Sequence, residues 1–186
     1  MEQLPQTLSS STAFEGLVFR VHVDTVRYED GSEHRFDAVE HQGSVGVIAT
    51  LPGEQILLVR QYRHPFAHML WEIPAGRIEP RELPADAAAR ELSEETGYRA
   101  QRIARVGTFA VTPGYCSEIL HLIHADDLLV GEQSLDEDER IAVRACTLDE
   151  AEKLTLAGEI ADMKTALALA WLRARRYQVP ATNVDM

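Results

Sequence analysis

The stretch from Gly76 to Tyr98, GRIEPRELPADAAARELSEETGY, carries the strongest pattern in this sequence. The part from Pro84 to Thr96 is rich in alanine, which favours a helix, and Gly97 is suited to end that helix. The stretch therefore predicts a turn followed by a helix of 13 residues, and the rest of the chain is interpreted around it.

Three glutamates gather on the predicted helix. At about 100° per residue, Glu91 and Glu95 lie one turn apart on one face, and Glu94 stands beside them. Carboxylates this close repel one another, so their clustering is best explained by a bound cation. Ligands that are all oxygen favour magnesium or manganese.

The spacing across the whole stretch is that of a known motif. Gly76 is followed after five residues by Glu82, and after seven more by Arg-Glu-aliphatic-any-Glu-Glu-any-Gly, ending at Gly97. This order resembles the Nudix box of the Nudix hydrolase family. Its one departure is Tyr98, where an aliphatic residue is usual, and that position concerns packing rather than metal chemistry. An ordinary solvated helix rich in glutamate is the bland alternative, which so many matched positions disfavour.

Composition narrows the class of protein. A chain of 186 residues suits one compact domain with an appendage, and a net charge of -12 disfavours nucleic acid or an anionic membrane as partner. Cys116 and Cys146 lie far apart without metal-ligand spacing, which indicates reduced thiols. The polar amino terminus lacks a signal peptide pattern, so we expect a soluble, cytoplasmic protein.

The first 43 residues are expected to form an appendage. Residues 1–12 are polar and suggest a loose arm, whereas residues 14–27 alternate in polarity like a strand. The Asp30-Gly31 turn and a return limb at 33–41 complete a predicted β-hairpin. Two strands alone are marginal in water, so the hairpin is expected to pack on its own body or on a partner subunit. The resemblance implies a homodimer contact here.

A catalytic domain is expected from residue 44 to residue 186. Its second predicted strand ends near Arg60 and Arg63. This guanidinium pair is expected either to clamp a pyrophosphate or to pair with acidic groups, with Arg63 favoured for the phosphate. The segment LWEIPAG then places Glu72, expected at the substrate, before a tight turn. That turn brings the Ala75 carbonyl close enough to the helix to serve as a further metal ligand.

Beyond the motif, the pattern predicts strands at 101–111, 117–125 and 141–146 and helices at 148–158 and 161–177. Asp126 and Asp127 are expected to begin a loop. His121 and His124, three apart in a strand, should face opposite sides and make poor joint ligands. A mixed sheet with helices on both sides follows, and the resemblance implies the Nudix α/β/α sandwich plus the N-terminal hairpin subdomain.

Further features resemble the ADP-ribose pyrophosphatase branch of the family. Pro113 lies sixteen residues beyond Gly97, in the turn TPGY, and the segments VRQYRHP and WEIPAG are also similar. The branch implies hydrolysis of ADP-ribose to AMP and ribose 5-phosphate with one to three divalent ions. By the same resemblance, the acidic segment at 131–140 supplies Glu139 as a further metal ligand and Glu137 as the base.

Roles are also expected for residues inside and beside the motif. Arg90 steadies the helix carboxylates and is counted with the catalytic residues, together with Glu94, a ligand and the reserve base. Tyr115 and Glu118 join Pro113 as substrate-binding candidates, Glu118 as a positioning carboxylate. Three alternatives stay open: a hydrolase of another nucleoside diphosphate sugar such as GDP-mannose, a non-catalytic Nudix-fold ligand sensor, and a purely structural dimer.

Overall fold

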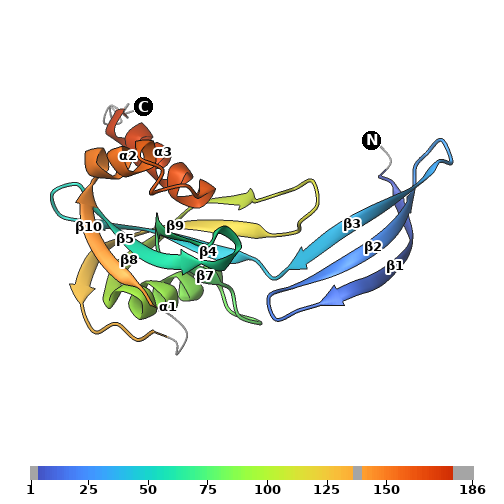
Figure 1. Cartoon of the computed structure of the whole chain (residues 1–186). Helices are drawn as coiled ribbons and strands as arrows, with labels where there is room; N and C mark the ends of the chain where they lie inside the picture. Colours follow the sequence, from blue (N-terminus) through green and yellow to red (C-terminus); the bar gives the residue numbers. More distant parts are fainter. Residues whose placement is uncertain (1–3, 136–139, 178–186) are drawn as a thin grey trace, which may run out of the picture.

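Within residues 4–135 and 140–177, which a computed structural model describes, the chain forms two β-sheets and three α-helices (Figure 1). The first sheet contains β1 (Gln6–Glu15), β2 (Phe19–Arg27) and β3 (Glu33–His41). The second contains β4 (Ser44–Leu51), β5 (Gln55–Arg63), β6 (His68–Glu72), β7 (Ala75–Arg77), β8 (Tyr98–Ala110), β9 (Ile119–Val130) and β10 (Ala142–Thr147). The helices are α1 (Pro84–Thr96), α2 (Leu148–Leu156) and α3 (Met163–Tyr177), with a 3-10 turn at His64–Phe66.

The second sheet is mixed, as predicted. Its strand order is β10-β5-β4-β9-β8, with β6 on β5 and β7 on β4. The neighbours β4 and β9 run parallel, with Ser44 opposite Leu120, and the other neighbouring strands are antiparallel. This register brings the start of β4 beside both β7 and β9, at the edge where the Gly76 turn meets α1.

Helices cover both faces of this sheet, which gives the predicted three layers (Figure 1). On β4, Val45, Val47 and Ala49 pack with α1, whereas Ile48 packs on the opposite face with α2 and α3. These alternate residues are all buried, as expected for a central strand covered on both sides. None of the helices in the described part of the chain is long and apolar enough to cross a bilayer.

The helix of the motif begins and ends where the sequence predicts. Pro84 stands in the first turn of α1, and Gly97 ends it with a left-handed φ of 76° while its N–H bonds to the Ser93 carbonyl. The predicted start of α2 is also confirmed, because Thr147 and Glu150 form a reciprocal capping box. The ends of α1 and the start of α2 are therefore determined by residues close to them in the sequence.

The N-terminal region differs from its prediction. The loose arm expected at residues 1–12 is wrong for the described part, because Gln6–Glu15 is a strand that pairs with β2 along its length. Hydrogen bonds to β2 satisfy backbone groups of this segment. Its side chains are largely polar, and for that reason the sequence did not indicate a strand here. The hairpin turn at Asp30-Gly31 is confirmed, so the predicted hairpin is part of a three-stranded sheet that extends away from the main body (Figure 1).

A second difference concerns Asp126 and Asp127. The loop expected there is wrong, because both residues lie within β9. Cross-strand pairing continues past them to Tyr98 opposite Val130, and Arg102 on β8 binds the Asp126 carboxylate at 2.7 Å. An opposite-charge pair across two strands stabilises a position where aspartate alone disfavours a strand.

Candidate active site

A cavity of about 610 Å³ lies beside the last two turns of α1. Its walls come from α1, β7 with the turn that follows it, and the end of β5. Four carboxylates line it, together with three guanidinium groups and the backbone of the Gly76 turn. The charged lining residues are Arg63, Arg77, Glu79, Arg90, Glu91, Glu94 and Glu95. The structure thus brings the motif carboxylates into one hollow with Arg63.

Gly76 allows the closest approach in this site. A Cβ added there would lie 1.9 Å from Glu91 Oε1 and 2.0 Å from its Cδ, so any other residue would displace the Glu91 carboxylate. The glycine that opens the motif is therefore required by contact with a glutamate fifteen residues later.

The neighbouring Ala75 turns its peptide groups toward α1. Val45 lies opposite Gly76 and the Val47 N–H donates to the Pro74 carbonyl, so Ala75 between them faces away from β4. The Ala75 N–H donates instead to Oε2 of Glu95 at 3.0 Å. Because N–H and C=O of one strand residue point to the same side, the Ala75 carbonyl shares the side of the helix carboxylates.

Arg90 is the hub of the helix charges. Its Nε and Nη2 bind the two oxygens of Glu82, each at 2.9 Å, while Nη1 donates to Glu91 at 2.8 Å and to Glu94 at 3.1 Å. Nη2 also donates to the Arg77 carbonyl. The Glu82 hydrogen bonds raise the pKa of Arg90, and Arg90 in turn lowers the pKa of Glu82. The Arg90 guanidinium thus fixes the positions of three motif carboxylates and of the backbone at Arg77 relative to one another.

Arg63 enters the cavity from the end of β5, and Glu72 holds it. Arg63 Nε and Nη2 donate to the two Glu72 oxygens at 2.7 Å each, and Lys164 also binds Glu72. The Glu72 side chain is 1% exposed. Burial raises the pKa of Glu72, but the bonds from Arg63 and Lys164 outweigh it, and the net pKa lies below the usual value. Glu72 is therefore an ionised carboxylate buried between two cations.

The donor set of this cavity suits a divalent cation. Carboxylate and carbonyl oxygens are the hard ligands that such ions take, and Glu91, Glu94, Glu95 and the Ala75 carbonyl supply them from one side. In residues 4–135 and 140–177, however, no three acidic, histidine or cysteine side chains converge on one point as they stand. Arg90 donates hydrogen bonds to Glu91 and Glu94, and the Ala75 N–H donates to Glu95. The three carboxylates therefore lie close together, but each is hydrogen-bonded to another group of the protein.

Several predicted site residues lie elsewhere. Arg60 does not form a pair with Arg63, because the two are three apart on β5 and face opposite sides; its guanidinium lies 5.9 Å from the Trp71 ring. Pro113 and Tyr115 are exposed in the turn between β8 and β9, where the Tyr115 carbonyl accepts from Val39 of β3. Glu118 accepts from the Ser44 hydroxyl at 2.7 Å. Glu137 and Glu139 lie outside the described residues.

Sequence reasoning missed some residues of the cavity. Gln61 lines it from β5, two residues before Arg63 and hence on the same face, a signal present in the segment VRQYR. Arg77 follows Gly76 directly and adds a cation beside the carboxylates. Ser134, whose N–H donates to the Glu94 carbonyl, comes from the acidic segment at 131–140, in which the sequence pointed to Glu137 and Glu139 rather than to this serine.

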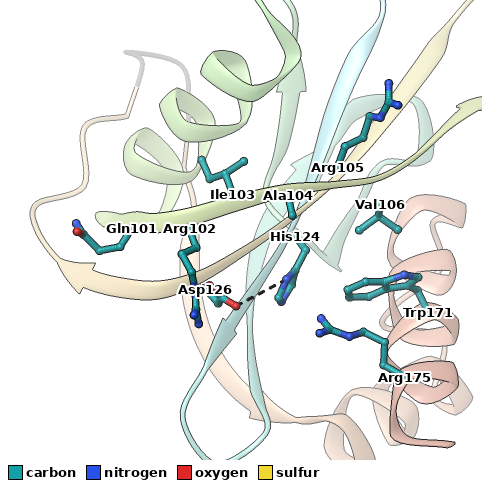
Figure 2. A pocket seen from close by; sticks show the side chains of 10 residues that line it. All are labelled: Gln101, Arg102, Ile103, Ala104, Arg105, Val106, His124, Asp126, Trp171 and Arg175. Atoms are coloured by element: carbon teal, nitrogen blue, oxygen red, sulfur yellow. Dashed lines mark hydrogen bonds and ion pairs between the residues drawn. The ribbon is translucent and has the colours of Figure 1, made fainter. Parts of the chain in front are cut away.

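A larger hollow of about 730 Å³ lies on the α3 side of the sheet (Figure 2). His124 and Trp171 meet there with ring centroids 5.2 Å apart, and Arg175 lies over the indole. Of the residues that line it in the described chain, Asp126 alone carries a carboxylate, and Arg102 binds that group. This hollow therefore lacks the oxygen ligands of the α1 cavity. His121 contacts Thr108 instead, in keeping with the predicted opposite faces.

Comparison with known proteins agrees with this geometry. The model of the NUDIX domain matches residues 40–167. The chain is 37% identical over 172 residues to an ADP-ribose pyrophosphatase of Bacillus subtilis (strain 168), covering 91% of this chain and 93% of that protein. It is 38% identical over 170 residues to a methanol dehydrogenase activator of Bacillus methanolicus, covering 90% and 92%.

A solved structure gives the same result for the fold. The crystal structure of an ADP compounds hydrolase superposes with a TM-score of 0.82 at 22% identity, covering 94% of this chain and 97% of that one. The motif spacing, the three-layer architecture around α1 and these matches over most of the length lead to one conclusion: the chain belongs to the Nudix family of hydrolases.

Proposed function

We propose that this protein hydrolyses the pyrophosphate linkage of ADP-ribose to AMP and ribose 5-phosphate with the help of divalent metal ions. The observation that carries the proposal is the single cavity in which Glu91, Glu94 and Glu95 face Arg63. Carboxylates that gather cations and a guanidinium that binds phosphate are the two groups that a pyrophosphate requires. The similarity to an ADP-ribose pyrophosphatase over nearly the whole chain supports the choice of substrate.

The metal ligands are Glu91, Glu94 and Glu95, with the Ala75 carbonyl and Glu139 as further ligands. One to three magnesium or manganese ions fit a donor set made of oxygen alone. When bound, such ions neutralise phosphate oxygens and lower the pKa of a coordinated water. Arg90 then has a second task, since the hydrogen bonds from its Nη1 to both Glu91 and Glu94 offset the repulsion between these carboxylates before a cation is present.

The remaining residues orient the substrate and move the proton. Arg63 presents its guanidinium to the pyrophosphate, and Glu72 fixes its direction. Glu137 accepts the proton of the attacking water, with Glu94 or Glu118 in reserve. Arg60, Pro113, Tyr115 and Glu118 are weaker substrate-binding candidates within one chain, because they are not among the residues that line the α1 cavity.

In this proposal the protein also acts as a cytoplasmic homodimer. Residues 1–43 contact the partner subunit, and residues 44–186 form the catalytic domain. The N-terminal sheet leaves large apolar side chains in solvent, among them Phe14, Phe19 and Phe36 at 53%, 43% and 41% exposure. Burying such a surface and an open sheet edge favours association. Neither nucleic acid nor a membrane is a partner, because the net charge of -12 repels both.

Light scattering tests the dimer. Two chains per particle are expected at micromolar concentration, and one chain after deletion of residues 1–41. A parent monomer, or a deletion variant that stays dimeric, contradicts this part of the proposal.

A substrate panel tests the activity. ADP-ribose, GDP-mannose and a nucleoside triphosphate are each incubated with the protein and magnesium, and products are separated by chromatography. The expected result is AMP from ADP-ribose at the highest kcat/KM. Faster release of GMP from GDP-mannose supports the alternative nucleotide-sugar hydrolase, and pyrophosphate release from a triphosphate contradicts both. Tight binding of ADP-ribose without turnover identifies a ligand sensor.

A further inference from the structure

A row of charged side chains leads from the start of α3 into the α1 cavity. Asp162 accepts a hydrogen bond from Lys164 Nζ at 3.0 Å, Lys164 binds Glu72, and Glu72 binds Arg63 through both oxygens. Their charges sum to zero. The exposed fraction of the side chain is 17% for Asp162 and 18% for Lys164, falls to 1% for Glu72 and rises to 35% for Arg63. The most exposed member of the row is thus the guanidinium in the cavity.

Lys164 is held firmly at its place in the row. Asp162 accepts from the Thr165 N–H at 3.0 Å as well as from Lys164, so it ties the lysine to the first turn of α3. The Thr165 hydroxyl in turn accepts from the Ile73 N–H at 2.9 Å, directly after Glu72. Two independent hydrogen bonds therefore fix the start of α3 against the segment that carries Glu72.

The contacts of Glu72 decide what Arg63 has left to offer. A guanidinium carries five N–H bonds. Glu72 accepts hydrogen bonds from two of them, the N–H of Nε and one N–H of Nη2. Both N–H bonds of Nη1 and the second of Nη2 remain for the cavity. A carboxylate in bidentate contact with Arg63 alone would cancel most of the charge that Arg63 presents to an anion. The second cation on the same carboxylate shares that negative charge.

We propose that Lys164 is a positioning residue for the substrate. By sharing Glu72 with Arg63, it fixes the direction of the Arg63 guanidinium and keeps its positive charge available to an anionic pyrophosphate. This inference rests on the proposed function for the identity of the substrate, but the row of contacts itself does not depend on it. Lys164 is not among the residues that line the α1 cavity, and its link to that cavity runs through Glu72.

The chain offers a matched control. Lys153 and Lys164 are the two lysines in the sequence, and Lys153 is an exposed residue of α2. The test compares Lys164→Met, which keeps the apolar stem, with Lys164→Arg, which restores the charge, and with Lys153→Met. Melting temperatures show whether each variant is folded, and Lys164→Gln replaces the methionine variant if that one is not.

Steady-state kinetics with ADP-ribose and calorimetric titration with ADP, both in magnesium, supply the readouts. For Lys164→Met we expect KM for ADP-ribose and Kd for ADP to rise by about tenfold, within the range of coupling between residues of one ion-pair network, while kcat changes by less than about threefold. Lys164→Arg should recover most of the affinity, and Lys153→Met should match the parent. A purely structural role would lower stability without this division between KM and kcat.

The outcomes separate the two proposals. If the parent does not hydrolyse ADP-ribose but Lys164→Met still weakens ADP binding and Lys164→Arg restores it, the proposed substrate is wrong and the role of Lys164 stands. Unchanged KM and ADP affinity in folded Lys164→Met overturn the inference, as does a loss confined to kcat. Failure of the parent to bind ADP at millimolar concentration overturns it as well.

Discussion

Replacement of Gly76 by alanine tests the contact on which the active site depends. The new Cβ would lie 1.9 Å from Glu91 Oε1, far inside van der Waals contact, so one of the two groups must move. The backbone at Gly76 is held by its pairing with Val45, whereas Glu91 is a side chain with rotatable bonds. We therefore expect the carboxylate to leave the cavity and the fold to remain.

The contacts of Glu91 set the magnitude. Its departure removes the Arg90 Nη1 hydrogen bond of 2.8 Å, and a bond to a charged group contributes roughly 1.5–3 kcal/mol. Arg90 keeps Glu82 and Glu94, and the displaced carboxylate regains water, so the free energy of unfolding should fall by only about 1–2 kcal/mol. That corresponds to a melting temperature lower by roughly 2–8 °C. A misplaced ligand should lower kcat/KM by about 10²-fold or more.

Thermal unfolding and kinetics in magnesium measure the two effects. Gly114→Ala is the stability control, because a Cβ there meets no heavy atom within 4 Å and should change the free energy of unfolding by less than about 0.5 kcal/mol. A double-mutant cycle adds Glu91→Ala, which removes the clash. In that background Gly76→Ala should cost almost no stability.

The result that refutes this reasoning is equally specific. If Gly76→Ala keeps parental kcat/KM, Glu91 is not required where the structure places it. If the alanine destabilises the Glu91→Ala protein as much as the parent, the cost arises from the backbone at Gly76 and not from the contact with Glu91.

Four further substitutions test the same site. Glu95→Gln should lower turnover by orders of magnitude with little loss of stability, because it keeps volume and removes a ligand charge; activity within a few-fold of the parent at saturating magnesium would contradict the metal assignment. Glu137→Gln should lower kcat by about 10²- to 10⁴-fold at an unchanged magnesium requirement, as expected for the loss of a base. Glu139→Gln should lower kcat and also raise the magnesium concentration for half activity, because it removes a metal ligand. If both variants behave like the parent, Glu94 or Glu118 is left as the base. The folded pKa of Glu72 lies below its usual value of 4.5, so its ion pairs stabilise the protein above that pH, and the stabilisation is lost as the pH falls through the folded pKa. Acid titration of stability should therefore show a smaller loss below pH 4.5 for Glu72→Gln than for the parent, and equal losses would show that Glu72 does not contribute.

The sequence by itself determined the elements whose physics is local. The bounds of α1, its αL glycine end and the start of α2 at its capping box depend on neighbours within four residues, and all three agree with the predicted ranges. The clustering of Glu91, Glu94 and Glu95 follows from helical periodicity alone. Spacing also predicted the mixed sheet with helices on both faces, because buried strands and amphipathic helices leave few other arrangements.

Only the tertiary structure decided which distant groups meet. Gln6–Glu15 is a strand because β2 satisfies its backbone, and Asp126 stays in β9 because Arg102 lies across from it, neither of which its own neighbours in sequence indicate. Arg63 pairs with Glu72 while Arg60 lies at the Trp71 ring, and Lys164 reaches the Glu72 carboxylate from a position 92 residues away in the sequence. Which charged groups pair in a folded chain depends on their distance in space and on their shared burial. Neither quantity can be read from the order of residues in the sequence, because packing alone brings distant segments together.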